Sequence, residues 1–261
     1  MSIYQLTPGK MSVIAPLFEG WDESLIWSCL QGIMGEAWAN QKENPKSARI
    51  VLADFCYFAG EANHELVTRG IKTQSRDFLI MVPPQDQNGS AWAQEIEKAY
   101  GRRCKRVERF AIKKEPGIFD RDKLEKIVAG LGSQYQVGLI TEEIFRQTRE
   151  QPWAKDFTSQ YADYNEYLRR GVGAFVLYGK ELVSGASSYT VYQEGIEIEI
   201  GTRQDHRRRG LAKACGASLI LECMDRKLYP SWDAQNRWSV ALAQELGYHF
   251  DHVYAAYEIY F

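Results

Sequence analysis

Residues 195–224 constrain the fold of this chain more than any other stretch. Residues 196–200 alternate isoleucine with glutamate, which is typical of a strand with one apolar and one polar face. A polar turn over residues 203–213 follows at once, and an apolar helical stretch follows the turn. A strand that enters a helix through a tight turn leaves backbone N–H groups without partners at the positive end of the helix dipole. This arrangement predicts a phosphate-binding turn.

The residue types in this turn suit a pyrophosphate. Gly210 allows a phosphate to approach the backbone closely, and the small side chain of Ala212 leaves that approach open. The basic side chains around them can make charge-assisted hydrogen bonds to phosphate oxygens. A run of charges is also the ordinary start of a solvated helix, and this alternative stays open for the turn taken alone. If the turn binds phosphate, the contacts come from Arg207, Arg208, Arg209, Gly210, Leu211, Ala212 and Lys213.

The segments around the turn predict a sheet of consecutive strands. Residues 174–178 and 181–192 are extended runs joined by a Gly-Lys pair, which indicates a hairpin. A helix over residues 161–170 precedes them, and residues 195–202 add a third strand. Residues 251–260 form a last strand that we expect to close the sheet.

A second polar block follows the helix after the turn. Residues 228–236 have the pattern of a short strand and a polar turn, and an apolar helix then runs to Leu246. Asn236 is placed to cap that helix, and Gly247 is placed to end it. A capping role and a contact with a ligand can both hold for the same residue.

The N-terminal half predicts a mixed α/β arrangement. Strands are expected over residues 49–59, 78–82 and 106–112, because these runs are apolar and rich in β-branched or aromatic residues. Helices are expected over residues 90–100 and 120–128, each with a capping side chain at its start and a glycine near its end. The half therefore has its own alternation of strands and helices.

Pro152 marks the expected division of the chain. The periodic pattern lapses over residues 147–156, and a proline in such a stretch favours a connection between domains. We therefore expect residues 1–150 to form the N-terminal α/β half and residues 151–261 to form the second domain.

Charge and cysteine content argue against several function classes. Lys and Arg (32) nearly balance Asp and Glu (34), and the net charge of -2 gives no field that would attract nucleic acid or a membrane surface. No segment approaches the roughly 20 apolar residues that span a bilayer, and no secretory leader is recognisable, so we expect a cytoplasmic protein. The five cysteines are scattered without a C-x-x-C pair, which predicts reduced, mostly buried thiols and no metal site.

The turn resembles the coenzyme-binding turn of the GNAT superfamily of N-acetyltransferases. The family signature is Arg or Gln, two residues, Gly, one residue, then Gly or Ala, and it is filled by Arg207, Gly210 and Ala212. The resemblance implies an α/β (α+β) fold with a mixed, mostly antiparallel sheet flanked by helices. The N-terminal α/β half is an addition to that fold.

The second polar block resembles the same family. The family has an asparagine, a small residue three positions on, an apolar residue, and a glycine next to an aromatic residue. The matching residues are Asn236, Ser239, Leu242, Gly247 and Tyr248. Together with residues 197–202 and 206–212, this block is similar to the subgroup that includes the zwittermicin-resistance acetyltransferases.

The resemblance implies acetyl-CoA as the cofactor. In the family the coenzyme lies in a V-shaped gap where the strand before the turn parts from the next strand. The backbone of Ile200 and Thr202 would then bind the pantetheine arm, the turn would hold the pyrophosphate, and Asn236 and Ser239 would complete the site. A small-molecule amine, which the sequence does not identify, would attack the thioester directly without an acyl-enzyme.

The resemblance also implies catalytic groups. A carboxylate would take a proton from the amine, and Glu197 and Glu199 share one face of the strand. The alternative is that both glutamates point into solvent from an amphipathic strand. Ala243 stands where the family usually has a tyrosine that protonates the departing thiolate, so Tyr248, Tyr254 or water would serve instead.

Several alternatives stay open. The missing tyrosine is compatible with a non-catalytic coenzyme-A binder. Ser187, Tyr189 and Tyr192 could face the acceptor or belong to the core. The N-terminal half could cover the acceptor or form a degenerate acetyltransferase-like lobe, and a homodimer is open as well.

Overall fold

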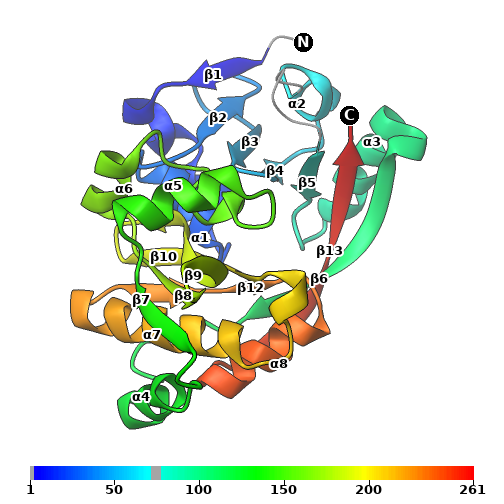
Figure 1. Ribbon diagram of the computed structural model, residues 1–261. Coiled ribbons are helices and arrows are strands. Elements are labelled where there is room, and N and C mark those ends of the chain that lie inside the picture. The colour runs from blue at the N-terminus through cyan, green and yellow to red at the C-terminus, as the bar shows by residue number, and fades with distance from the viewer. Residues whose placement is uncertain (1–2, 72–77) are drawn as a thin grey trace. The chain divides into compact units, whose positions relative to one another are not determined.

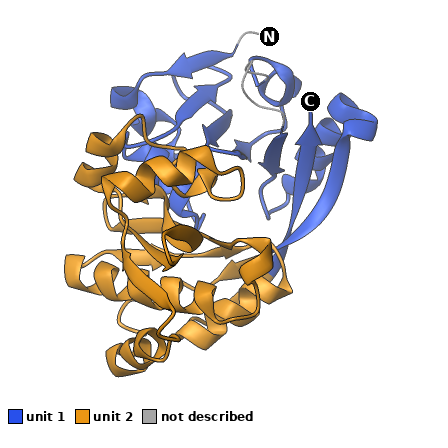
Figure 2. Ribbon diagram, in the orientation of Figure 1, with its two compact units in different colours: residues 1–109, 253–261 blue, residues 110–252 orange. Residues whose placement is uncertain are grey.

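The computed structural model describes residues 3–71 and 78–261. It divides into two compact units, one formed by residues 1–109 and 253–261 and the other by residues 110–252 (Figure 2). Strands β6 and β13 carry the chain from one unit into the other, because each division falls within one of them. We describe each unit by itself.

The first unit is built on a mixed sheet with strands in the order β1-β2-β3-β4-β5-β13-β6 (Figure 1). The pairs from β1 to β4 are antiparallel, β4 and β5 are parallel, and β5 pairs antiparallel with the end of β13. In chain order, its elements are β1 Tyr4–Leu6, η1 Pro8–Val13, η2 Ala15–Phe18, α1 Ser24–Leu30, β2 Glu36–Ala39, β3 Ser47–Leu52, β4 Phe55–Gly60, α2 His64–Thr68, β5 Phe78–Val82, α3 Gly89–Tyr100, η3 Gly101–Arg103, β6 Cys104–Ile112 and β13 Phe250–Tyr260.

The core of the first unit lies between its sheet and the helices α2 and α3. Phe58 from β4, Leu79 from β5 and Ile259 from β13 are buried against Leu66 of α2 and Trp92 of α3. Apolar residues from segments far apart in the sequence therefore form one cluster, and burial of that cluster stabilises the unit.

The second unit is built on a five-stranded sheet in the order β11-β10-β9-β8-β7. Strands β7 to β10 are antiparallel neighbours, whereas β10 and β11 are parallel. In chain order, its elements are α4 Arg121–Ala129, β7 Tyr135–Leu139, α5 Glu142–Glu150, η4 Lys155–Phe157, α6 Tyr164–Arg170, β8 Gly173–Tyr178, β9 Glu181–Tyr192, β10 Gly195–Thr202, η5 Gln204–His206, α7 Leu211–Arg226, β11 Tyr229–Ser231, β12 Asp233–Ala234 and α8 Arg237–Leu246.

Helices cover both faces of this second sheet. On one face α7 packs closely, since a Cβ added to Gly216 would lie 3.4 Å from the Ile200 side chain. On the other face the ring of Phe157 lies against Gly185 and Gly201, where added Cβ atoms would come within 2.7 and 3.3 Å of it. Successive residues of a strand point to opposite faces, so Ile200 faces α7 and Gly201 faces Phe157.

Most expected elements match the structure, with small shifts at their ends. The strands over residues 78–82 and 195–202 have the expected bounds. The run over residues 49–59 instead forms two strands, because Ala53 adopts a positive φ of 51° and turns the chain between β3 and β4. The helix expected from Ser90 begins one residue earlier and follows Asn88.

The division of the chain differs from the expected one near Pro152. Residues 110–150 belong to the second unit, since β7 pairs with β8 and α4 packs on α7. The last strand also differs from expectation, because its end pairs with β5 in the first unit. Both differences arise from long-range strand pairing, which local composition does not encode.

None of the helices in the described ranges combines the length and apolar character that crossing a bilayer requires.

Candidate functional site

Strand β10 loses its parallel neighbour partway along its length. Gly195–Glu197 pair with Tyr229–Ser231, and β11 then ends while β10 continues to Thr202. Among the described residues, the second half of β10 pairs with β9 alone. This strand separation is what the resemblance predicts for the gap that holds the pantetheine arm.

The turn after β10 is open at the start of α7. Gly210 has a φ of 77°, and a side chain built there would meet nothing within 4 Å. The first helical hydrogen bond is donated by Ala214 to the Gly210 carbonyl at 3.0 Å. The N–H groups of residues 211–213 therefore have no partner within the helix and lie at its positive end. The geometry fits a phosphate group.

Arg203 stabilises the beginning of the turn by hydrogen bonds. Its Nε and Nη2 donate to the Asp205 carboxylate at 2.8 and 3.0 Å, and Nη1 donates to Glu181 in the β8–β9 hairpin at 2.9 Å. The hydrogen bonds from Arg203 lower the pKa of the Asp205 carboxyl. Both carboxylates near the turn are thus paired with a cation, which reduces their repulsion of an anionic ligand.

The three consecutive arginines have different surroundings. Arg207 Nε donates to the Thr202 carbonyl at 3.3 Å, and Arg209 donates to the Tyr135 hydroxyl at 3.2 Å. Arg208 is exposed, has a φ of 62°, and makes no ion pair within residues 3–71 and 78–261. Arg208 is therefore the guanidinium that is most available to a ligand, while Arg207 and Arg209 hold the turn.

His206 is a turn residue that sequence reasoning missed. Its buried ring lies 5.3 Å from the ring of Tyr178 and 6.2 Å from that of Tyr135, the same tyrosine that Arg209 contacts. These contacts join the turn to β7 and β8. Because β7 lies far upstream, no local pattern could have indicated them.

Glu197 lies where β10 and β11 separate. Its register partners are Thr190 in β9 and Ser231, the last residue of β11. The residue is only 6% exposed, whereas Glu199 is half-buried opposite Ser187. The alternative of two glutamates on a solvent face is therefore wrong for Glu197.

Two tyrosine hydroxyls next to Ser231 are already hydrogen-bonded. The Tyr192 hydroxyl lies 2.9 Å from Ser231 Oγ, and the Tyr248 hydroxyl donates to the Pro230 carbonyl at 2.7 Å. Burial raises the pKa of both tyrosines, and the charge of Glu197 adds to the effect. Both stay protonated near neutral pH, and the Tyr248 proton is directed at Pro230.

The other expected proton donor, Tyr254, is a buried residue of β13 in the part that belongs to the first unit. Ala243, at the place of the family's usual tyrosine, is fully buried in α8. The identity of the proton donor therefore remains a prediction.

The remaining expected cofactor residues have structural contacts of their own. Asn236 caps α8, accepting a hydrogen bond from Ser239 N at 3.0 Å, so its capping role is confirmed. Ser239 Oγ accepts from Trp232 Nε1 at 3.0 Å. Thr202 Oγ1 bonds with Ser184 Oγ at 2.8 Å, and Ile200 points towards α7. Their coenzyme contacts remain predictions.

All five cysteines are free, as expected, and four of them are buried. Burial raises the pKa of Cys29, Cys215 and Cys223 to about 12, and that of Cys104 to about 11. Such thiols carry almost no thiolate near neutral pH, so they do not provide a nucleophile. Across the described ranges, no group of three His, Cys, Asp or Glu residues is placed to hold a metal ion.

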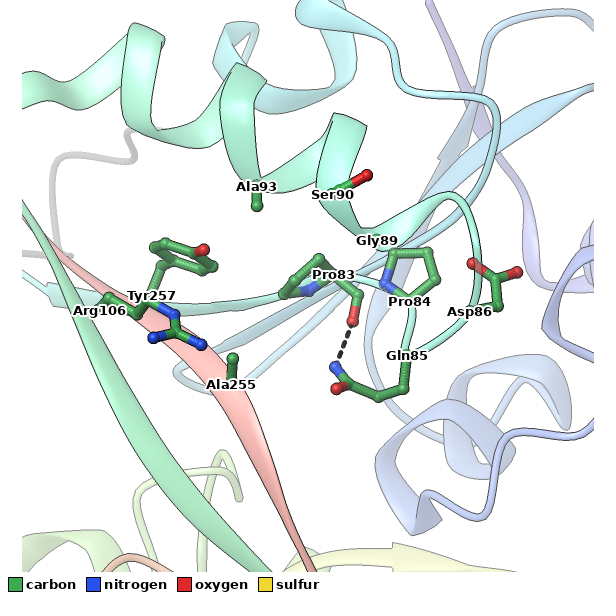
Figure 3. A pocket seen from close by; sticks show the side chains of 10 residues that line it. All are labelled: Pro83, Pro84, Gln85, Asp86, Gly89, Ser90, Ala93, Arg106, Ala255 and Tyr257. Atoms are coloured by element: carbon green, nitrogen blue, oxygen red, sulfur yellow. Dashed lines mark hydrogen bonds between the residues drawn. The ribbon is translucent and has the colours of Figure 1, made fainter.

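The first unit has a hollow of about 330 Å³ between the start of α3, β6 and β13 (Figure 3). Polar groups at its edge are engaged within the chain: Gln85 donates to the Pro83 carbonyl at 2.8 Å, and Asp86 accepts from Asn88 N at 2.8 Å. None of the site residues expected from the sequence lines this hollow.

Comparisons with known proteins extend over nearly the whole chain. The model of a family described as GNAT acetyltransferase matches residues 15–257. YdfB of Bacillus subtilis (strain 168), an uncharacterised N-acetyltransferase, is 25% identical over 265 residues, which are 95% of this chain and 95% of that protein.

Two solved structures show the same fold. A GCN5-related N-acetyltransferase-like protein from Streptococcus suis 89/1591 is 38% identical, with a TM-score of 0.89 over 97% of this chain and 100% of that chain. A tandem GNAT protein from the clavulanic acid biosynthesis pathway has a TM-score of 0.56 and 12% identity, over 99% of this chain and 98% of that chain.

Proposed function

Because the chain belongs to the GNAT acetyltransferase family, and is therefore an acyltransferase, we propose that it moves the acetyl group of acetyl-CoA directly onto a small amine acceptor. The observation that carries this proposal is the opening of β10 after Glu197 onto the turn at Gly210. A gap between strands that leads to an open helix start can take a ligand with an extended arm and a phosphate end.

The chain's own residues would hold acetyl-CoA by backbone and charge. The N–H groups of residues 208–213 and the side chain of Arg208 would bind the pyrophosphate, and Arg207 and Arg209 would keep the turn in shape. The free edge of β10 near Ile200 would bind the pantetheine arm. When bound, the coenzyme supplies an activated acetyl group as a thioester.

Glu197 would take the proton from the acceptor amine. An ammonium group cannot attack a carbonyl carbon, so a base that removes its proton raises the rate, typically by about 10²–10⁴-fold. Glu197 is supported over Glu199 by its burial and by its place where β10 and β11 separate. The carboxylate then keeps that proton while the amine nitrogen forms its bond to the acetyl carbon.

The departing thiolate also needs a proton. Burial raises the pKa of Tyr248, which therefore stays protonated and can donate. Tyr248 and Tyr254 remain the proposed donors, with water as the third. Tyr248 would have to leave its bond to Pro230 first. This requirement makes water the simplest proposal.

The narrower expectations remain proposals. The similarity to the zwittermicin-resistance subgroup rests on the sequences of three short segments. The acceptor amine is not identified. A homodimer and a cytoplasmic location are proposed only from the sequence.

Two measurements test the function. The first follows release of free coenzyme A thiol from acetyl-CoA in the presence of glucosamine, spermidine or L-lysine. The second follows the melting temperature on addition of coenzyme A, since a ligand at 100 times its dissociation constant stabilises the folded state by about 2.7 kcal/mol. We expect stabilisation together with turnover of at least one amine. Stabilisation without turnover of any amine would favour a non-catalytic binder, and no stabilisation at millimolar concentration would exclude the proposal.

A further inference from the structure

Thr190 carries a buried hydroxyl without a hydrogen-bond partner. The residue is fully buried in β9, and its Oγ1 has no hydrogen-bond partner among the described residues. A buried polar group left unpaired costs about 1–3 kcal/mol, and nearly all such groups in native proteins are bonded to protein or to ordered water. The Thr190 hydroxyl therefore calls for a partner that the chain itself does not provide.

The serine hydroxyls of the same strand are satisfied. Ser184 bonds with the Thr202 hydroxyl at 2.8 Å, Ser187 with the Tyr167 hydroxyl at 2.9 Å, and Ser188 with the Tyr161 hydroxyl at 2.7 Å. Thr190 differs from its neighbours in this respect. The serine side chains of β9 have hydrogen-bond partners within the protein, so the unpaired hydroxyl of Thr190 indicates a role beyond folding.

The position of Thr190 indicates that role. It is the register partner of Glu197, and the register shifts directly afterwards, leaving Tyr189 as an extra residue in β9. Side chains directly opposite each other on adjacent strands share a face, with Cβ atoms about 4.5–5.5 Å apart. The unpaired hydroxyl therefore lies on the same face as the Glu197 carboxylate, at the point where β10 and β11 separate.

The chemistry of the two side chains suits a shared water molecule. An ionised carboxylate only accepts hydrogen bonds, whereas a threonine hydroxyl can donate and accept. The nearby hydroxyls of Tyr192 and Tyr248 are already engaged with Ser231 and Pro230. A water between Thr190 and Glu197 would satisfy the hydroxyl and donate to the carboxylate.

We propose that Thr190 is a positioning residue that holds a water beside Glu197, and that this water carries the proton from the acceptor amine to Glu197. The inference rests on the proposed acetyl transfer. As the amine nitrogen attacks the thioester carbon, its proton passes to the water, which gives one of its own protons to the carboxylate. Thr190 keeps its own proton throughout and fixes where the water lies.

Two variants at one position test this role. Thr190→Val removes the hydroxyl at nearly constant volume, and Thr190→Ser retains it. We expect Thr190→Val to lower kcat about 10- to 100-fold with the KM for acetyl-CoA unchanged, since misplacing a reacting group costs up to about 10²-fold. Thr190→Ser should keep kcat within about threefold of the wild type. The melting temperature of Thr190→Val should equal or exceed that of the wild type, because the lost hydroxyl had no protein partner.

A crystal structure of the wild type with coenzyme A provides a readout that needs no acceptor. We expect a water within about 3.2 Å of both Thr190 Oγ1 and the Glu197 carboxylate, and its loss in Thr190→Val. An unchanged kcat in Thr190→Val, equal losses in both variants, or a protein partner for Thr190 Oγ1 would overturn the proposal. Failure of acetyl transfer itself would look different: the wild type would turn over no amine, and the crystal structure alone would then decide whether the water is held.

Discussion

The two units contain the same strand arrangement, but the space beyond the parallel strand pair is filled in the first unit and the helix start is open in the second. In the first unit β4 pairs in parallel with β5 through Phe55–Tyr57, and in the second β10 pairs in parallel with β11 through Gly195–Glu197. Each leading strand then continues past its partner. An antiparallel meander precedes the pair in both units, and a helix follows the leading strand.

The first unit fills the space beyond its parallel pair. Trp92, on the helix after β5, is fully buried, donates from Nε1 to the Gly60 carbonyl at 2.9 Å and stacks on Phe58 at 4.6 Å. The residue at the same helical position of α8 in the second unit is Val240, which is half-buried. In the first unit a tryptophan thus fills the space beyond the parallel pair and donates to the carbonyl at the end of β4.

The helices that follow the two leading strands, α2 and α7, also differ in whether their first turn is open. In the first unit α2 has five residues, and the Asn63 side chain already accepts from Leu66 N. In the second unit α7 has 16 residues and follows Gly210, where an added side chain would meet nothing within 4 Å. The two units thus share a strand arrangement, but only the second keeps an open helix start after its leading strand. This difference favours the alternative that the N-terminal half is a degenerate acetyltransferase-like lobe.

The largest expected effect on coenzyme A binding is at the open helix start. Gly210→Glu should weaken coenzyme A binding more than about 100-fold, because a carboxylate would occupy the place of the pyrophosphate at a backbone position that disfavours side chains. Isothermal titration calorimetry measures the loss. Gly117→Glu is the matched control, since Gly117 has a φ of 85° with nothing within 4 Å and also lies in the second unit. Equal losses in both variants would point to backbone strain instead of the anion site.

Glu197→Gln should lower turnover by about 10²–10⁴-fold near neutral pH while coenzyme A binding stays unchanged. At high pH the deficit should shrink, because more of the amine is already neutral. Steady-state rates measured across pH test this expectation. Glu199→Gln should have a smaller effect, and a wild-type profile in Glu197→Gln would leave deprotonation to another group.

Trp92→Ala should destabilise the protein by about 3–5 kcal/mol, because it empties a fully buried position and leaves the Gly60 carbonyl without its donor. Urea unfolding measures the change. The affinity of the folded variant for coenzyme A should remain that of the wild type, since the proposed site lies in the second unit. Weaker coenzyme binding by folded Trp92→Ala would contradict the division of roles.

The smallest effect separates Arg208 from Arg209. Arg208→Ala should raise the dissociation constant for coenzyme A about 10-fold, which is about 1.4 kcal/mol, with no change in stability. Arg209→Ala should instead lower the melting temperature, because it removes the contacts with Tyr135 and the Asp205 carbonyl. A melting curve and a titration on each variant distinguish the two. If Arg208→Ala lowered the melting temperature and Arg209→Ala weakened coenzyme A binding, Arg209 would be the ligand contact and Arg208 would stabilise the turn.

The features that sequence predicted well are local ones. The alternation over residues 195–202, the glycine of the turn and the caps at Asp120 and Asn236 depend on residues close together in the chain, and the structure has each of them. Burial was harder to predict. The glutamates suggested a polar face, yet Glu197 is covered, because period-two alternation does not tell which layers a sheet acquires.

Non-local features were beyond the sequence pattern. The pairing of β13 with β5 and the filling of the first gap by Trp92 join segments that are far apart in the chain. The unpaired hydroxyl of Thr190 emerges only once the register of β9 and β10 is known. A single sequence carries no signal for such contacts.

The stoichiometry of coenzyme A binding tests the central difference between the units most directly. Calorimetric titration of the wild type should give one molecule bound per chain, and the same titration of Gly210→Glu should give none. Two molecules bound per chain would reveal a second coenzyme site, and one molecule still bound by a folded Gly210→Glu variant would place the site away from Gly210. Either result would contradict a single site at this turn.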